Sequence, residues 1–178
     1  MRIIGGSLRG KTIDICPDFK GRPTTDFAKE ALFNILDSEY DFERLKVLDL
    51  FSGTGSVSFE FASRGVGHIW SVEMNAQYAA WIKKEASRLK LPNITVVHHN
   101  AFDFIPICEE KFDIVFADPP YDLEGVETLP ERILTQGLVY PERTLVIEHS
   151  DAHSFCGHPC FVKERHYGRV HFSFFEPR

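Results

Sequence analysis

From residue 46 onward, short apolar runs alternate with longer amphipathic stretches. The apolar runs have the length of strands and span residues 46–51, 68–73, 94–99, 112–118 and 143–149. The amphipathic stretches have apolar residues at helical spacing near 55–64, 75–90 and 124–136. Nearly continuous apolar strands separated by helices are typical of a parallel sheet with helices on both faces. We therefore predict an α/β fold with a mostly parallel, doubly wound sheet.

The segments before and after this core have other patterns. Residues 1–15 alternate apolar and polar side chains around glycines, which predicts a hairpin or a pair of short strands. A helix should begin at Thr25 or Asp26, because either side chain can cap its first turn. The apolar residues that follow at helical spacing are Phe27, Ala28, Ala31, Leu32, Ile35 and Leu36. Residues 161–176 form two strand-like runs around Tyr167-Gly168, which predicts a closing antiparallel hairpin.

The composition is that of an ordinary globular domain. Of the 178 residues, 43% are hydrophobic and 26% are charged, and no run approaches the roughly 20 apolar residues of a membrane helix. The N-terminus lacks the apolar core of a secretory signal, and the four cysteines do not indicate a disulfide framework. We expect one cytoplasmic, monomeric domain over 1–178, with a basic β extension over 1–23 and a helix plus the doubly wound core over 24–178.

Charge is distributed unevenly along the chain. The net charge is −6, but residues 1–22 carry five basic and two acidic side chains, and residues 161–178 carry four and two. Basic ends on an acidic body fit a protein that binds nucleic-acid phosphates with its termini. Chance scatter of surface charge explains the same distribution, so both interpretations stay open at this point.

A glycine-containing loop, residues 49–55, lies where the first core strand ends and a helix begins. Gly53 and Gly55 let the backbone turn sharply and approach a ligand closely, but Ser58 replaces the third glycine of a dinucleotide fingerprint. Asp49 puts a carboxylate near the ligand, which suits a zwitterion with a sulfonium and an amino group better than a pyrophosphate. Glu73 ends the second strand, where an acid can bind both ribose hydroxyls. The loop therefore predicts a nucleoside cofactor, the alternative being a turn whose glycines serve only the backbone.

The tetrapeptide Asp118-Pro119-Pro120-Tyr121 directly follows the fourth apolar run. Its two prolines fix an extended backbone and remove amide donors, which leaves carbonyl oxygens to point into a site. Asp118 and the Pro119 carbonyl can each accept one hydrogen of an NH2 group, and Tyr121 can stack on a planar ring. A proline-rich turn without function is the alternative. The position of the tetrapeptide, in a sheet that also carries Asp49 and Glu73, favours a site.

This arrangement suits methylation of an exocyclic amine on a nucleic-acid base. The lone pair of such an amine is delocalised into the ring, and accepting both of its hydrogens favours a pyramidal, nucleophilic nitrogen. The contribution of the protein is then mostly orientation and electrostatics. A base stacked within a helix cannot reach such a pocket, so the target nucleotide must be flipped out or already unpaired.

With both motifs considered together, the chain resembles the Rossmann-like class I methyltransferases that have an Asp-Pro-Pro-Tyr motif. More narrowly, it resembles the bacterial enzymes that methylate guanine N2 in small-subunit ribosomal RNA. The matching segments follow in order over nearly the whole chain: MRIIGGSLRGK, RPTTDFAKEALFNIL, VLDLFSGTGS, FASRG, FDIVFADPPY and the late YG. The segment from RPT to EALFNIL is the most specific, because the other motifs occur in many amino-methyltransferases.

The resemblance implies roles for particular residues and S-adenosylmethionine as the cofactor. It implies catalysis by Asp118, Pro119, Pro120 and Tyr121. It implies cofactor contacts by Asp49, Phe51, Ser52, Gly53, Gly55, Glu73, Met74, Asn100, Ala101 and Asp118. It implies that ribosomal RNA or the small subunit is bound by Arg9, Lys11, Arg22, Thr24 and Arg169. Two of these depart from the family pattern: Asn100 replaces an acid near the adenine, and Arg169 follows Gly168 where a smaller polar residue is common.

Three rival functions stay open. A DNA or other RNA amino-methyltransferase acting on adenine or cytosine can use the same tetrapeptide, although a DNA enzyme normally has a sizeable target-recognition region. A protein-glutamine methyltransferase usually has Asn in place of Asp118. A non-catalytic RNA-binding assembly factor would keep only the fold, and the acids Asp49, Glu73 and Asp118 are against it.

One cluster late in the chain has metal-ligand residue types. His153, Cys156, His158 and Cys160 lie within eight residues. A structural zinc site usually has paired ligands and a second cluster at a distance. We therefore expect a surface loop of reduced cysteines and no metal.

Overall fold

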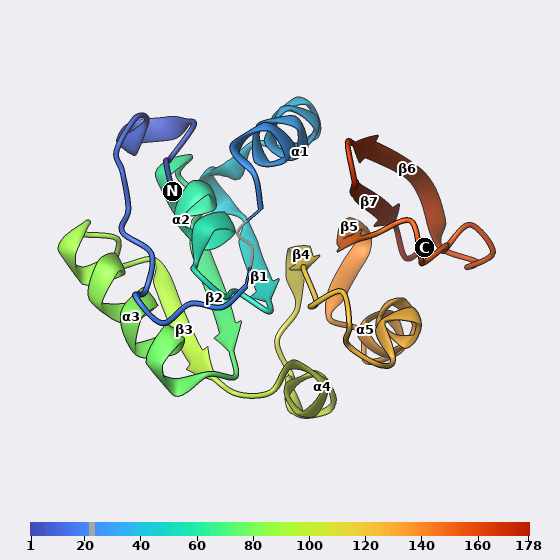
Figure 1. Ribbon diagram of the computed structural model, residues 1–178. Helices are drawn as coiled ribbons and strands as arrows, with labels where there is room; N and C mark the ends of the chain where they lie inside the picture. Colours follow the sequence, from blue (N-terminus) through green and yellow to red (C-terminus); the bar gives the residue numbers. More distant parts are fainter. Residues whose placement is uncertain (22–23) are drawn as a thin grey trace.

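The computed structural model describes residues 1–21 and 24–178, and a seven-stranded sheet dominates it (Figure 1). The strands are β1 (Lys46–Leu50), β2 (His68–Glu73), β3 (Ile94–His98), β4 (Phe112–Ala117), β5 (Val139–His149), β6 (Phe161–Tyr167) and β7 (Val170–Phe175). Their order is β3-β2-β1-β4-β5-β7-β6. The first five pair in parallel, and β7 pairs antiparallel with both β5 and β6. The predicted α/β class, the mostly parallel sheet and the closing hairpin are confirmed.

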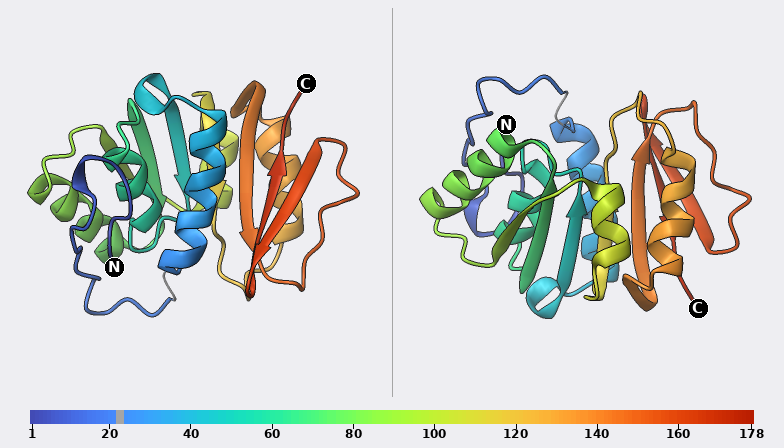
Figure 2. Two further views of the ribbon diagram at one scale, coloured as in Figure 1. Left: turned by 90° about the horizontal axis from the view of Figure 1, so that it is seen from above. Right: turned by 90° about the horizontal axis from the view of Figure 1, so that it is seen from below.

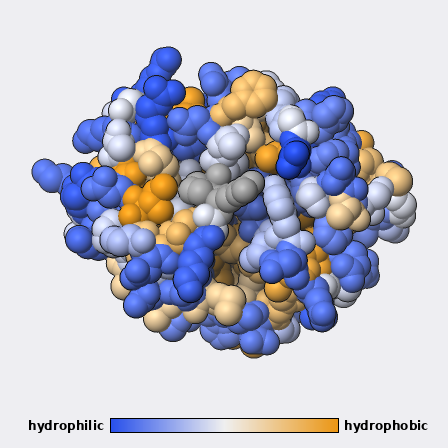
Figure 3. Space-filling model, viewed as in Figure 1, coloured by the Kyte–Doolittle hydropathy of each residue, from blue (hydrophilic) through white to orange (hydrophobic). Residues whose placement is uncertain are grey.

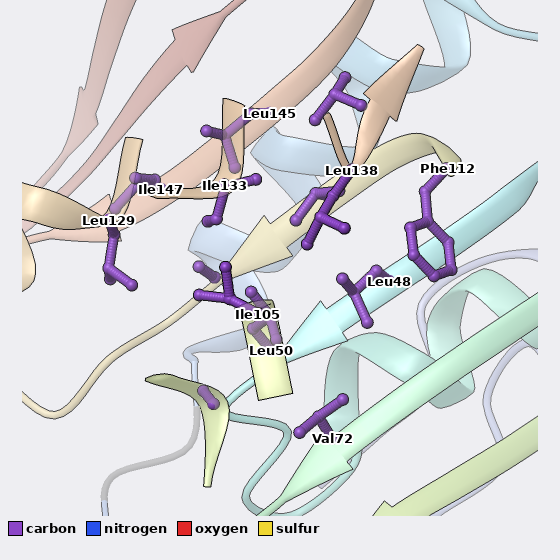
Figure 4. Close-up of a cluster of buried hydrophobic side chains, with 14 of the residues drawn as sticks. Leu48, Leu50, Val72, Ile105, Phe112, Leu129, Ile133, Leu138, Leu145 and Ile147 are labelled. Atoms are coloured by element: carbon purple, nitrogen blue, oxygen red, sulfur yellow. The ribbon is translucent and has the colours of Figure 1, made fainter. Parts of the chain in front are cut away.

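Helices cover both faces of the sheet (Figures 1 and 2). They are α1 (Asp26–Glu39), α2 (Ser56–Ser63), α3 (Ala76–Arg88), α4 (Ala101–Phe104) and α5 (Leu129–Thr135). On one face, α1 and α2 pack on strand residues such as Val47 and Phe116. On the other face, α4 and α5 cover strand residues such as Leu48 and Ile147, which Figure 4 shows pointing into one cluster. The strands are therefore buried on both sides, which explains their continuous apolar runs.

Helix α1 forms where the sequence predicted it, but its buried face differs from the prediction. The Thr25 hydroxyl accepts a hydrogen bond from the Ala28 amide at 3.2 Å, which confirms the predicted cap. Phe27 is 66% exposed and its ring lies edge-on to Tyr167 at 5.9 Å, whereas Phe33 is fully buried. Lys29 is buried as well, because the carboxylate of Glu60 on α2 lies 3.7 Å away.

The predicted N-terminal hairpin is present only as one β-bridge, between Arg2 and Thr12. The tip of the loop winds into a 3-10 turn over Gly6–Leu8. The amides of Ile4 and Gly5 donate to the Glu60 carboxylate at 2.9 and 2.7 Å, so they cannot extend a strand ladder. The segment is therefore held both by backbone hydrogen bonds between its two ends and by the Glu60 side chain of α2.

The region before β5 also differs from the prediction. The predicted helix over 124–136 is divided into a 3-10 turn, Val126–Thr128, and the shorter α5. Strand β5 begins at residue 139 rather than 143, and its register with β4 shifts between Phe112 and Ile114. The apolar pattern is interrupted there by Pro141 and by Glu142, which has a φ of 60°. The start of the strand therefore could not be predicted from the pattern.

Hydrophilic side chains cover most of the face in Figure 3, where hydrophobic residues form separate patches. Within residues 1–21 and 24–178, we find no helix with the length and apolar character that crossing a membrane requires.

Candidate active site

Four acids gather at the carboxyl edge of the sheet. Asp49 lies near the end of β1, Glu73 ends β2, Asp118 directly follows β4 and Glu148 lies near the end of β5. In an open α/β sheet, ligands bind outside the carboxyl ends of the strands, where the strand order reverses. Here the reversal lies between β1 and β4, so the predicted cofactor loop and the tetrapeptide flank it.

The glycine loop after β1 has the backbone that close ligand approach requires. Gly53 and Gly55 have φ values of 53° and 76°, in the left-handed region that favours glycine. A Cβ on Gly55 would lie 2.8 Å from the ring of Phe59, so no larger residue fits there without rearrangement. Phe51, which is not a glycine, also has a positive φ of 64°. Such strain is typical of functional turns.

Glu73 fixes the shape of this loop. Its two carboxylate oxygens accept hydrogen bonds from the amides of Gly53 at 2.8 Å and Asn75 at 2.7 Å. Each oxygen keeps a further lone pair that can accept a ribose hydroxyl. Burial raises the pKa of Glu73 above its ordinary value, although the amide donors oppose the shift. Exposed Met74 follows at the outer edge of the site.

Asp49 is buried under the loop rather than presented at its surface. It is 1% exposed and accepts a hydrogen bond of 2.5 Å from the Ser58 hydroxyl. Burial raises its pKa to about 7. The serine that replaces the third fingerprint glycine therefore has a structural role: it holds this carboxylate in the core.

Asn100 and Ala101 are brought to the same edge by α4. The Asn100 side-chain oxygen accepts hydrogen bonds from the amides of Phe102 at 2.8 Å and Asp103 at 3.4 Å, so the residue caps the helix. Because these amides engage the oxygen, only the NH2 group of Asn100 is left to face a ligand. The sequence analysis missed α4, because a helix of one turn is too short to show a periodic pattern.

Asp118 lies between two other carboxylates and the start of α1. Thr24 donates to it at 3.4 Å and lies 3.3 Å from Glu148. Burial, with the charge of Asp49 as a second cause, raises the pKa of Asp118 to about 7. Tyr121 is 54% exposed, so a face of its ring is accessible to a planar group.

The predicted RNA-binding residues do not all lie near Asp118. Thr24 contacts it directly, and the β6–β7 turn that holds exposed Arg169 lies beside the end of β5. Arg9 and Lys11 are exposed on the N-terminal segment, whose tip packs against the far end of α2. Arg22 lies outside the described residues.

Two further residues at the site were missed by the sequence analysis. The sequence analysis placed Glu148 only within a strand. An acid near the end of an otherwise apolar strand is the signal by which it could have been found. Phe19 contacts the glycine loop, because a Cβ on Gly53 would lie 3.3 Å from its ring. Its segment is held by Tyr78 of α3, whose hydroxyl donates to the Asp18 carbonyl at 3.0 Å. No sequence pattern indicates that contact.

No group of three His, Cys, Asp or Glu side chains within residues 1–21 and 24–178 is arranged to hold a metal ion. Cys156 is exposed, Cys160 is partly exposed, and both are free thiols.

The chain as a whole is similar to known proteins in sequence and in fold. The family described as Conserved hypothetical protein 95 matches residues 1–176. The chain belongs to this family. Ribosomal RNA small subunit methyltransferase D of Escherichia coli K12 is 32% identical over 154 residues, which cover 83% of this chain and 74% of that protein. The enzyme of the same name from Haemophilus influenzae is 31% identical over 152 residues, covering 83% and 78%.

A solved structure of a hypothetical protein from Thermus thermophilus superposes with a TM-score of 0.87 at 29% identity, and covers 99% of each chain. The family and the fold predicted from the sequence are thus confirmed, and so is the methyltransferase activity. The individual site residues stay predictions.

Proposed function

We propose that this methyltransferase transfers a methyl group from S-adenosylmethionine to the N2 amine of a guanine in small-subunit ribosomal RNA. The observation that carries the proposal is the position of Asp118-Pro119-Pro120-Tyr121, which follows β4 at the same sheet edge as the glycine loop and Glu73. The names of the relatives, which specify small-subunit ribosomal RNA, support the substrate.

The described residues fit the cofactor. The free lone pairs of Glu73 suit the ribose hydroxyls, and the sharp turn at Gly53 and Gly55 admits a close-lying ligand. Met74 and Asn100 flank the place expected for the adenine. Asp49, buried beneath the loop, is ionised only above its raised pKa of about 7, and a cationic ligand over the loop would favour that ionised form. When bound, S-adenosylmethionine supplies an electrophilic methyl group on a positively charged sulfur.

The chain's own residues orient the nucleophile. The Asp118 carboxylate and the Pro119 carbonyl accept the two hydrogens of the exocyclic amine, and the exposed ring of Tyr121 stacks on the base. A carboxylate with a pKa near 7 is also a suitable acceptor for the proton that the amine releases. Because the site lies at the edge of the sheet within the folded domain, a stacked base cannot reach it, and the target nucleotide must leave its stack to enter the site.

Methyl transfer should depend on pH through Asp118. Its pKa is raised to about 7, so the accepting carboxylate is present above that pH and is lost below it. We expect kcat/KM to rise as the pH increases from 6 to 8. Steady-state rates across this range, with Asp118→Asn as a control that removes this titration, measure the effect. A kcat/KM that stays flat across the range would contradict it.

Glu73→Ala should weaken S-adenosylmethionine binding by roughly 1–3 kcal/mol, because hydrogen bonds to a charged group are removed. Calorimetry with the cofactor and with S-adenosylhomocysteine measures the change. Glu43→Ala, an exposed acid in the turn before β1 at the opposite sheet edge, is the matched control and should bind normally. Equal affinity of the two variants would show that Glu73 does not contact the ribose.

Arg9 and Lys11 should contribute to RNA binding by pairing with backbone phosphates. Replacing both with Ala is expected to flatten the dependence of log K on log salt by about 0.7–0.9 for each phosphate that is no longer neutralised. Filter binding between 50 and 200 mM salt tests this, with Lys111→Ala as a control. Cofactor affinity should stay the same, and an unchanged salt slope would place the RNA elsewhere.

The rival substrates are separated by one labelling experiment. The protein and methyl-labelled S-adenosylmethionine are incubated in parallel reactions with small ribosomal subunits, with their isolated RNA, or with DNA. The products of each reaction are then fractionated into nucleic acid and protein. We expect label in the RNA of the subunit sample. Label in DNA would favour a DNA amino-methyltransferase, label in protein a protein methyltransferase, and no transfer to any substrate an assembly factor.

A further inference from the structure

Glu148 lies beside Asp118 but has no role in the mechanism above. Ala117 and Ile147 are register partners on the parallel strands β4 and β5, so Asp118 and Glu148 are the next pair along. Because side chains alternate along a strand, both point to the face on which Phe116 and Val146 pack under α1. Glu148 is 3% exposed and has no cationic partner within residues 1–21 and 24–178, which is unusual for a buried acid.

The hydrogen bonding of this pair is incomplete. Within the described residues, the only partner of Glu148 is the Thr24 hydroxyl at 3.3 Å, and the same hydroxyl lies 3.4 Å from Asp118. A hydroxyl has one hydrogen and can donate to one carboxylate at a time. One of the two acids therefore needs another donor when both are ionised.

Electrostatics also indicates a missing donor. Burial and the neighbouring charge of Asp118 raise the pKa of Glu148 well above its ordinary value. Because both carboxylates are buried and lie within 3.4 Å of one hydroxyl oxygen, ionising the two together is unfavourable. A ligand that offers several hydrogens along one edge would stabilise both charges.

We propose that Glu148 accepts the N1 hydrogen of the target guanine while Asp118 accepts a hydrogen of its N2 amine, so that Glu148 selects guanine. The inference rests on the proposed function and adds the residue that chooses the base. Guanine has a donor at N1 beside its amine, whereas adenine has an acceptor at N1 and cytosine an acceptor at N3 beside theirs. An ionised Glu148 attracts the N1 hydrogen of guanine and repels the acceptor nitrogens of adenine and cytosine.

The test replaces the target guanine by 2-aminopurine, which keeps the N2 amine but has an acceptor at N1. The modified position is first located in RNA methylated by the wild type, and subunit RNA is then ligated with guanine or 2-aminopurine there. The quantity measured is the ratio of kcat/KM for the two RNAs. Comparing this ratio between protein variants cancels the intrinsic difference in reactivity of the two amines.

Glu148→Gln keeps the side-chain shape but can present either an oxygen or an NH2 group to the base. We expect the preference of the wild type for guanine to fall at least about tenfold in this variant. Glu142→Gln, at an exposed acid on the same strand, is the matched control and should leave the ratio unchanged. Thermal melting checks that both variants are folded.

A merely structural Glu148 would behave differently. If it only held Thr24 at the start of α1, Glu148→Gln would lower both rates by the same factor and keep the ratio, and this result would overturn the inference. A wild type that methylates guanine without discriminating against 2-aminopurine would overturn it as well. A wild type that methylates no guanine at all would instead overturn the proposed function, and the selection of guanine with it.

Discussion

Asp118→Ala is expected to lower the rate of methyl transfer at least about 100-fold, the effect of removing a group that contacts the reacting atoms. The affinity for S-adenosylmethionine should hardly change, because the expected partner of Asp118 is the amine. Single-turnover rates and calorimetry on the same preparation measure the two quantities.

The stability of this variant gives a second check. Asp118 lies among Asp49, Glu148 and Thr24, and its raised pKa means that its charge is unfavourable in the folded protein. Removing it should therefore leave the melting temperature at pH 8 unchanged or raise it. A variant that keeps its activity would contradict the proposed catalytic role, and one that loses cofactor affinity to the same extent as activity would move Asp118 to the cofactor site.

Glu60→Ala should strongly destabilise the fold, with an expected decrease of about 3–5 kcal/mol in the free energy of unfolding. Glu60 is fully buried and lies 3.7 Å from the ammonium group of Lys29, which is 1% exposed. It also accepts hydrogen bonds from the amides of Ile4 and Gly5. The substitution leaves a buried cation without its carboxylate and removes two hydrogen bonds that hold the N-terminal segment. Urea unfolding measures the change.

Glu85→Ala is the matched control for this prediction. Glu85 is also a buried acid on a helix, but its partner Arg88 is about half exposed and can turn toward water. Its replacement should therefore cost clearly less stability than that of Glu60. Equal decreases in the free energy of unfolding of the two variants would show that burial of the Lys29–Glu60 pair gives Glu60 no special role in stability.

Most of the fold could be predicted, because its strands are buried on both faces and their apolar runs are continuous. Elements that tertiary contacts create were not predictable. Phe27 has the spacing of a core residue and is exposed, while Lys29 is buried because Glu60 lies opposite. The predicted N-terminal hairpin forms only around the bridge between Arg2 and Thr12, because Glu60 accepts the amides of Ile4 and Gly5 that would extend it.

The site was predictable as far as its residues follow strand ends in the chain. Asp49, Glu73 and Asp118 stand at such ends, and the sequence predicts each. That Glu148 adjoins Asp118 depends on β4 and β5 being neighbours in the sheet, which their order in the chain does not require. Thr24 lies 94 positions before Asp118 and 124 positions before Glu148 in the chain, so no local pattern indicates these contacts.

The most direct measurement identifies the methylated nucleoside. Small ribosomal subunits that lack the modification are incubated with the wild-type protein and S-adenosylmethionine, and their RNA is digested to nucleosides for mass spectrometry. We expect N2-methylguanosine. Methyladenosine or methylcytidine would contradict the choice of guanine and leave the amino-methyltransferase chemistry standing, whereas a methyl group found only in protein would contradict both.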